Sequence, residues 1–125
     1  MKIVCVEPLG IPQTRFEELK SHYASMGHEF TYYMDRREDE PTLSDRMGNA
    51  EVVVISNIKL TANVLSQCTK LCYLSVAFTG LDHIDLDYCK AHNIQVQNAA
   101  GYSTTAVSEL AVGMMLDLLR NIVTL

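Results

Sequence analysis

Three aspartates and one histidine fall within six residues of this 125-residue chain, from Asp82 to Asp87. Carboxylates beside an imidazole are the groups that carry out general acid–base chemistry, and histidine changes its charge near neutral pH. Such a pair must converge in one cleft, whereas consecutive residues of a turn point in different directions. The spacing therefore favours structural roles for these side chains.

The pattern predicts a role for each member of this cluster. Asp85 precedes a short helical stretch and suits its N-cap, and Asp87 falls in the first helical turn, where negative charge favours the helix dipole. Asp82 could accept a hydrogen bond from the turn backbone. His83 could act as a catalytic base, but the interpretation we favour is a histidine that faces solvent or packs against its neighbours.

A backbone site beside the cluster is the stronger candidate for binding. The apolar stretch 72–78 is followed by Thr79 and Gly80, and the glycine permits a sharp turn that brings N–H groups close to a ligand. Successive N–H groups in a turn can bind an anion without a cationic side chain. We predict a carboxylate site on the Thr79 and Gly80 amides; the alternative is that Gly80 only makes the turn.

The loop before the last expected helix is a second candidate. The ring of Tyr102 could form a wall of a small pocket and offer its hydroxyl as a polar group, although a tyrosine that only packs is the equal alternative. Ser103 or Thr104 would cap the helix, and Glu109 lies early in it, where its charge favours the dipole.

Alternating strand-like and helix-like segments surround these loops. Short apolar stretches alternate with segments whose apolar residues recur every three or four positions, which is typical of parallel strands joined by helical crossovers. We predict an α/β fold: a flavodoxin-like doubly wound parallel sheet in the order 2-1-3-4-5. The expected strands are 2–8, 28–34, 51–57, 72–78 and 94–99, and the expected helices are 12–27, 42–47, 60–68, 85–93 and 103–125.

The last expected helix is apolar around nearly its whole circumference. Such a helix is usually buried on nearly all sides, and residues 1–102 offer it only one sheet face. We therefore expect a long C-terminal interdomain helix with one side on this domain and the other on a missing partner. Its uncovered side should drive self-association. The chain also shows no helix stop signal before its end, so it looks cut.

Several classes of function receive no support. The net charge is −5 and no basic run occurs, so we predict no nucleic-acid partner. No signal peptide and no apolar tract of membrane-spanning length is present, so we expect a cytoplasmic protein without a membrane partner. The sequence contains no GxGxxG, P-loop or GxSxG motif. Its four cysteines form no CxxC pair, so we expect buried thiols and no metal site.

Residues 79–122 resemble the segment of D-isomer-specific 2-hydroxyacid dehydrogenases that closes the substrate domain and enters the cofactor domain. That family pattern runs G-x-D-x-I-D, a short helix, G-I-x-V-x-N, a loop with V-A-E, and a long helix ending in L-x-R. Two positions depart mildly from it, Asn93 in place of glycine and Ser108 in place of alanine. The matching residues are Gly80, Asp82, Ile84, Asp85, Ile94, Val96, Asn98, Val107, Glu109 and Arg120.

The resemblance implies a two-domain enzyme that interconverts small 2-oxo and 2-hydroxy acids in the cleft between its domains. Residues 1–102 would be the substrate-binding domain, and residues 103–125 would lead into an absent Rossmann-type domain that binds NAD or NADP. The Thr79 and Gly80 amides would hold the substrate carboxylate. Tyr102 and Ser103 would help to form the pocket, and Val107 would approach the cofactor.

In that family the substrate-orienting arginine, the glutamate–histidine pair and the glycine-rich cofactor loop come later in the chain. We can therefore place no catalytic residue in this sequence, and His83 is not the family's catalytic histidine. We expect the chain alone to bind no cofactor and to show no turnover, and we expect a homodimer.

Two other classes of function remain open. A receiver-like signalling module would need an aspartate at the end of the third strand and a lysine after the fifth, but Asn57 and the lysine-free 97–104 stand there. A short, non-catalytic binding or assembly protein could have kept only the loop that binds a small acid.

Overall fold

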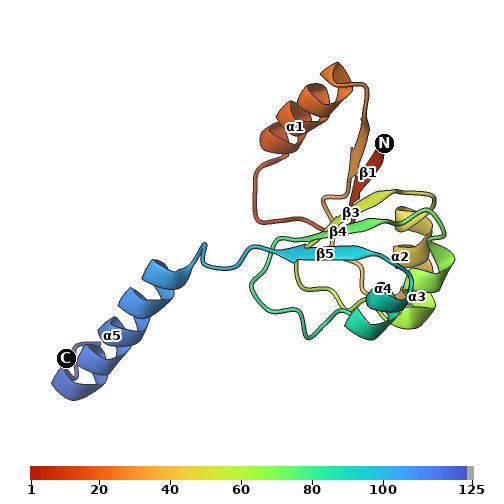
Figure 1. The fold of residues 1–125 in the computed structure, drawn as a ribbon. Coiled ribbons are helices and arrows are strands. Elements are labelled where there is room, and N and C mark those ends of the chain that lie inside the picture. Colours follow the sequence, from red (N-terminus) through yellow and green to blue (C-terminus); the bar gives the residue numbers. More distant parts are fainter. Residues whose placement is uncertain (124–125) are drawn as a thin grey trace.

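The computed structural model describes residues 1–123 and contains a five-stranded sheet in the order β2-β1-β3-β4-β5 (Figure 1). Every neighbouring pair of strands is parallel. The predicted fold and strand order are therefore confirmed. The strands are β1 (Lys2–Cys5), β2 (Glu29–Tyr32), β3 (Val52–Ile55), β4 (Tyr73–Val76) and β5 (Gln95–Asn98). The helices are α1 (Gln13–Ser25), α2 (Glu40–Met47), α3 (Ala62–Gln67), α4 (Leu86–Ala91) and α5 (Thr104–Arg120).

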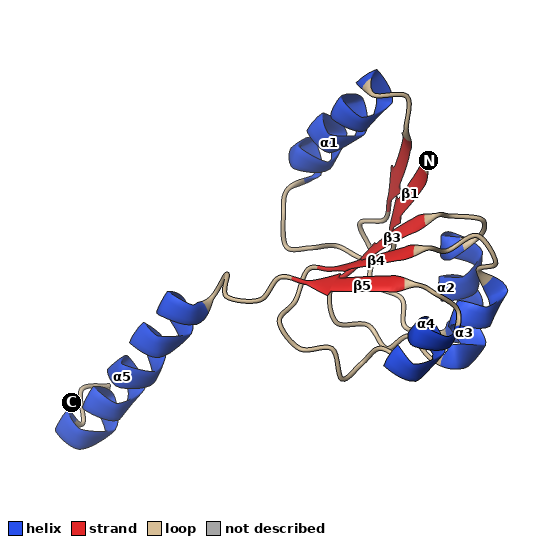
Figure 2. Cartoon of the chain, in the orientation of Figure 1, coloured by secondary structure: helices blue, strands red, loops and turns tan. Residues whose placement is uncertain are grey.

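The direction of each crossover decides which face of the sheet a helix covers. The chain moves from β1 to β2 in one direction along the sheet and from β3 to β5 in the other. Because such crossovers are right-handed, α1 lies on one face and α2, α3 and α4 lie on the other (Figure 2). All strands end at the same edge, where the loops 77–85 and 99–103 lie.

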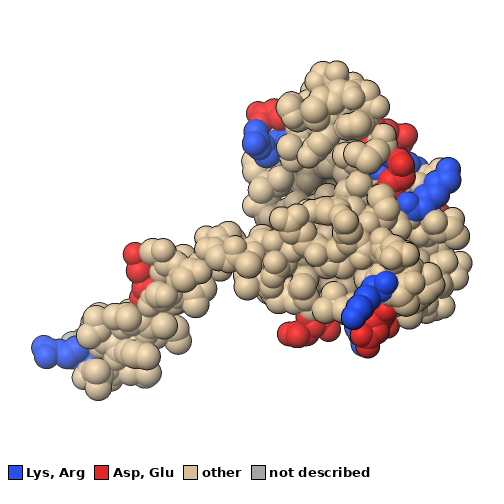
Figure 3. Space-filling model, in the orientation of Figure 1, with Lys and Arg blue, Asp and Glu red and all other residues tan. Residues whose placement is uncertain are grey.

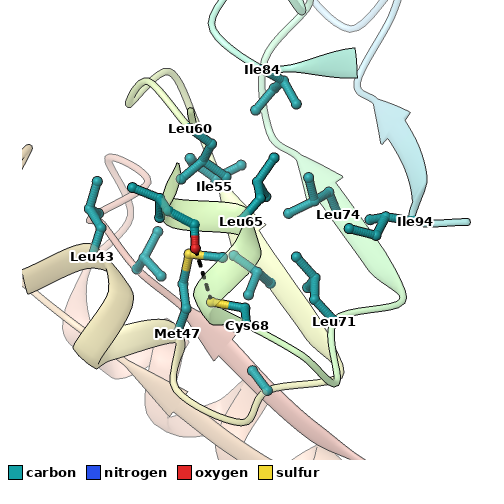
Figure 4. Close-up of a cluster of buried hydrophobic side chains, with 14 of the residues drawn as sticks. Leu43, Met47, Ile55, Leu60, Leu65, Cys68, Leu71, Leu74, Ile84 and Ile94 are labelled. Carbon is teal, nitrogen blue, oxygen red and sulfur yellow. Dashed lines mark hydrogen bonds between the residues drawn. The ribbon is translucent and has the colours of Figure 1, made fainter. Parts of the chain in front are cut away.

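Two hydrophobic clusters fill the space between the sheet and its helices. The larger one packs α2, α3 and α4 against alternate residues of the strands (Figure 4). Its labelled members are Leu43, Met47, Ile55, Leu60, Leu65, Cys68, Leu71, Leu74, Ile84 and Ile94. The smaller cluster contains Ile3, Cys5, Phe16 and Phe30, and it packs α1 against β1 and β2. Met26, which the apolar spacing places on the buried side of this helix, is exposed at its C-terminus.

Local capping fixes where the short helices begin and end. The Thr61 side chain accepts from the Val64 N–H at 3.4 Å, and Asp85 Oδ1 accepts from the Tyr88 N–H at 2.9 Å. The predicted N-cap at Asp85 is confirmed, and Thr61 caps α3 in the same way. Asn93, just after α4, has a φ of 56°, in the left-handed region where glycine is most favourable and asparagine is tolerated. This conformation explains why asparagine can replace the usual glycine there.

The long helix α5 departs from the prediction. None of its residues is buried, and it projects away from the sheet instead of packing on it (Figure 1). It ends at Arg120, because Asn121 takes a left-handed conformation with φ of 56° that stops a helix, a signal that the sequence interpretation missed. Thr124 and Leu125, which we expected to be helical, lie outside the described residues. The Ser103 side chain makes no capping hydrogen bond.

Glu7 is a buried carboxylate that joins three segments of the chain. Its side chain is only 1% exposed. One oxygen, Oε1, accepts from the N–H groups of Ser56, Asn57 and Ile58 at 2.7, 3.0 and 3.2 Å. The other, Oε2, accepts from Arg36 at 2.7 Å. A buried charge is stable only when it is paired and hydrogen-bonded, and both conditions are met in this contact.

Arg46 is the second buried charge near this edge. It donates to the carbonyls of Val6 and Asp35, both at 2.9 Å, and pairs with the Asp35 carboxylate at 2.7 Å. Its guanidinium also lies 4.2 Å from the ring centroid of Tyr33. Hydrogen bonds from Arg46 and Arg37 lower the pKa of Asp35. Together, Arg46 and Glu7 hold the chain after β1, β2 and β3 in fixed positions.

We predict that Glu7→Ala lowers the free energy of unfolding by about 2–3 kcal/mol, because the N–H groups of Ser56, Asn57 and Ile58 lose their acceptor inside the protein. Glu38→Ala is the matched control, since Glu38 also pairs with Arg36, at 2.7 Å, but is 65% exposed. This control should cost less than about 1 kcal/mol. Urea unfolding followed by circular dichroism measures both values, and equal losses would contradict the role assigned to Glu7.

Candidate functional site

The loop after β4 is tied to the end of β5 by two hydrogen bonds. The Ala99 N–H donates to the Phe78 carbonyl at 3.0 Å. The Asn98 side-chain amide donates to the Thr79 carbonyl at 2.7 Å. Two successive carbonyls of the loop therefore face β5, which fixes the orientation of both peptide groups between Phe78 and Gly80.

These orientations align two N–H groups. In a trans peptide the N–H lies opposite the C=O, and no cis peptide occurs among the described residues. The N–H groups of Thr79 and Gly80 share their peptides with the two bonded carbonyls, so both point away from β5. Within residues 1–123 neither N–H donates to a protein acceptor. Adjacent, aligned and unused N–H groups are the donors that a backbone anion site needs.

Gly80 places no side chain beside these two N–H groups. A Cβ atom built at this glycine would lie 3.8 Å from the Phe78 ring and 3.9 Å from Asp82 Oδ2, which is ordinary contact. The backbone of Gly80 also has no positive φ. The glycine is therefore not required by a strained turn, and its lack of a side chain leaves the backbone accessible.

The neighbouring loop after β3 also aligns N–H groups, but they are already used. The N–H groups of Ser56, Asn57 and Ile58 converge on the Glu7 carboxylate, which Arg36 also pairs with. Sequence reasoning missed this contact, because Arg36 lies in a charged run that is typical of a solvated loop. Of these two sets of N–H groups, only the pair at Thr79 and Gly80 is therefore available to a ligand.

The β3 and β4 loops are held together in register. The Leu60 N–H donates to the His83 carbonyl at 2.8 Å, and the Asp85 N–H donates to the Leu60 carbonyl at 3.1 Å. A single parallel bridge pairs Leu60 with Ile84. The backbone of the β4 loop is thus fixed from both sides, by the β3 loop at one end and by β5 at the other.

The acidic cluster forms the junction between strand and helix. Asp85 caps α4 and Asp87 lies in its first turn, as predicted. Asp82 makes no hydrogen bond to the turn backbone among residues 1–123, so that expectation is wrong. The His83 ring packs edge-on against Phe78 at 6.1 Å between centroids, and its Nε2 is buried without a partner in the described chain. No acid–base pair converges in this part of the described chain.

The remaining predicted site residues lie farther along the chain. Tyr102 is exposed and Ser103 is half-buried on the connection to α5, and Val107 is exposed on the first turns of that helix. No hydrogen bond or ring contact joins Tyr102 or Ser103 to the β4 loop in residues 1–123. The structure therefore aligns the N–H groups of Thr79 and Gly80, and among residues 1–123 no hydrogen bond joins Tyr102, Ser103 or Val107 to them.

The cysteines offer no reactive centre near this site. Burial raises the pKa of the Cys5 thiol to about 12, and it also raises the pKa values of Cys68 and Cys89. Only Cys72 is exposed, which corrects the expectation that all four thiols are buried. Among residues 1–123 no group of three or more histidine, cysteine or acidic side chains is arranged to hold a metal ion. In the same part of the chain no helix combines the length and apolar character needed to cross a bilayer.

Comparison with known proteins gives one consistent result. A family model described as "D-isomer specific 2-hydroxyacid dehydrogenase, catalytic domain" matches residues 3–123. Erythronate-4-phosphate dehydrogenase of Shewanella halifaxensis is 32% identical over 119 residues, which are 94% of this chain and 28% of that protein. Glycerate dehydrogenase of Methylorubrum extorquens is 34% identical over 100 residues, which are 76% of this chain and 32% of that protein.

The solved structures agree with the sequence relatives. NAD-dependent formate dehydrogenase of Staphylococcus aureus, solved with NAD, is 29% identical and superposes with a TM-score of 0.79. The match covers 98% of this chain and 39% of that one. The chain thus spans about a third of the length of the two curated relatives.

We predict that the native protein exposes one fast-reacting thiol to Ellman's reagent at mildly alkaline pH, because ionisation of the three buried thiols is suppressed. Cys72→Ser should remove this fast phase and leave the slow reaction of the three buried thiols. Full reaction of all four thiols should require denaturant. Fast labelling that persists in Cys72→Ser would contradict the burial of Cys5, Cys68 and Cys89.

Proposed function

Because the chain belongs to the D-isomer specific 2-hydroxyacid dehydrogenase family, we propose that it forms the part of such an enzyme that holds the carboxylate of a 2-oxo or 2-hydroxy acid. The observation that carries the proposal is the pair of aligned, unused N–H groups of Thr79 and Gly80 at the carboxyl edge of the sheet. Ligands of open parallel sheets bind at this edge. A small carboxylate has the charge and the size that two adjacent N–H donors match.

The complete enzyme would extend beyond these 125 residues. In this proposal residues 1–102 are the substrate-binding domain, and residues 103–125 lead into a domain that binds NAD or NADP. The hydride would come from the bound nicotinamide cofactor. The proton and the orienting positive charge would come from side chains outside this sequence, because no acid–base pair converges in residues 1–123. Turnover by the isolated chain is therefore not expected.

Three further residues have proposed roles at the junction between the domains. The aromatic ring of Tyr102 would form a wall of the substrate pocket, with Ser103 beside it. Val107, which is 60% exposed on α5, would contact the cofactor. Their exposure supports this proposal, because side chains that serve a site between two domains must face outward from each domain alone.

A cytoplasmic location of the protein stays a prediction.

The exposed apolar surface of α5 supports a protein partner. Its largest side chains are more than half exposed, and Figure 3 shows few charged groups along it. Large contiguous apolar surfaces are rarely left bare in soluble proteins. We propose that the cofactor domain covers this helix in the complete enzyme, and that copies of the isolated chain pair through it as a homodimer.

We predict that oxamate, a stable analogue of a 2-oxo acid, shifts the amide resonances of Thr79 and Gly80 in a saturable way. The experiment is a ¹H–¹⁵N correlation titration of the 125-residue chain. The neutral ester of oxamate is the control, because it keeps the shape and loses the charge. Two results would overturn the proposed site. The resonances of both amides could stay unchanged at saturating oxamate, or the ester could bind with the same affinity as oxamate.

A second prediction concerns self-association. Light scattering after size exclusion should show dimers of this chain at high concentration, and Leu118→Arg on α5, where Leu118 is 81% exposed, should shift them toward monomer. Met26→Arg is the control, because Met26 is exposed outside α5. A wild-type chain that stays monomeric at high concentration would count against pairing through α5.

A further inference from the structure

We propose that Asn98 is a positioning residue: its side-chain amide sets the direction of the Gly80 N–H and thereby forms the anion site. This inference rests on the proposed function and names the residue that makes the site competent. Asn98 itself does not contact the substrate in this proposal. It acts through the peptide between Thr79 and Gly80, whose carbonyl it bonds at 2.7 Å.

The regular ladder between β4 and β5 does not reach this peptide. The last paired residues are Val76 and Asn98, and one further backbone bond, from Ala99 to Phe78, fixes the peptide before Thr79. That bond orients the Thr79 N–H. The following peptide, which carries the Gly80 N–H, has no backbone partner on β5 in the described residues. Within those residues, its contact with β5 is the hydrogen bond from the Asn98 side chain.

Without that hydrogen bond the peptide could rotate. Gly80 lacks a Cβ, and its position has only ordinary contacts with Phe78 and Asp82. Thr79 is exposed, so solvent would satisfy its carbonyl in other orientations as well. A rotated peptide would turn a carbonyl oxygen toward the site in place of the N–H. The partial negative charge of this carbonyl oxygen would then repel the carboxylate that the site is proposed to bind.

The bond also strengthens the donor. A peptide whose carbonyl accepts a hydrogen bond is polarised, and its N–H becomes a better donor in a chain of hydrogen bonds. Such assistance matters at this position, because Asp82 Oδ2 lies 3.9 Å from the position of a Gly80 Cβ and its charge opposes an incoming anion. Two aligned N–H groups must therefore outweigh one nearby carboxylate.

Asn98→Asp gives the sharpest test. A carboxylate at this position cannot donate to the Thr79 carbonyl, and it can accept from the Gly80 N–H if the peptide rotates. The variant should therefore turn the N–H inward toward β5 and abolish oxamate binding. Asn98→Ala should only release the peptide and weaken binding by roughly tenfold, the effect of losing a hydrogen bond of about 1.4 kcal/mol.

Two measurements on the 125-residue chain separate this inference from the proposed function. The first, without ligand, is the residual dipolar coupling of the Gly80 N–H, which reports its direction. It should change in both Asn98 variants and stay unchanged in Gln97→Ala. Gln97 is the matched control, because it lies next to Asn98 on β5 and its amide oxygen accepts a different bond, from the Tyr73 hydroxyl. The second is the oxamate titration of all four proteins.

The outcomes are distinct. A Gly80 coupling that is unchanged in the Asn98 variants overturns the inference whether or not oxamate binds. Wild-type affinity in Asn98→Ala overturns it equally. A changed coupling in a protein whose wild type never binds oxamate supports the orienting role of Asn98 but overturns the proposed substrate site. Urea midpoints within the range of the Gln97→Ala control exclude general unfolding as the cause.

Discussion

A single buried carboxylate determines how the loops at the carboxyl edge of the sheet are arranged. Glu7 follows β1 and binds three successive N–H groups after β3 together with Arg36 from the segment after β2. These groups are distant in sequence and meet only because parallel strands bring their ends to one edge. The β3 loop, once held, anchors the β4 loop through the bridge between Leu60 and Ile84. The candidate site is thus supported by a chain of contacts that begins at Glu7.

Two sets of backbone N–H groups at this edge have different roles. The N–H groups after β3 are satisfied internally by Glu7, so they contribute rigidity. The N–H groups of Thr79 and Gly80 are unused within the described residues, whereas the carbonyls of the same two peptides, those of Phe78 and Thr79, are bonded to β5. Under the proposed function, a neutral backbone site would allow release as well as binding, because two N–H groups attract a carboxylate less strongly than a buried cation would.

Buried and exposed apolar residues lie in different parts of the chain. The sheet with α1 to α4 encloses two hydrophobic clusters, whereas α5 has no buried residue. A helix that is apolar on nearly all sides gains stability only from surfaces that pack against it. Residues 1–123 provide no such surface, and the matched region makes up 28% and 32% of the two curated relatives. This exposure supports the proposal that another domain or another copy of the chain covers the helix.

The sequence by itself determined the strand order, the positions of α1 to α4, the N-cap at Asp85 and the loop that holds Thr79 and Gly80, because all of these follow from local periodicity, capping and chain direction. Tertiary structure alone decided the contact between Glu7 and Arg36, the hydrogen bond from Asn98 to the Thr79 carbonyl, and the exposure of α5. These features depend on pairings between residues far apart in the chain and on which surfaces are present to pack, as the bond from Asn98 to Thr79, 19 residues apart, illustrates. No periodicity along the chain encodes them, since the partners meet only after the sheet has formed.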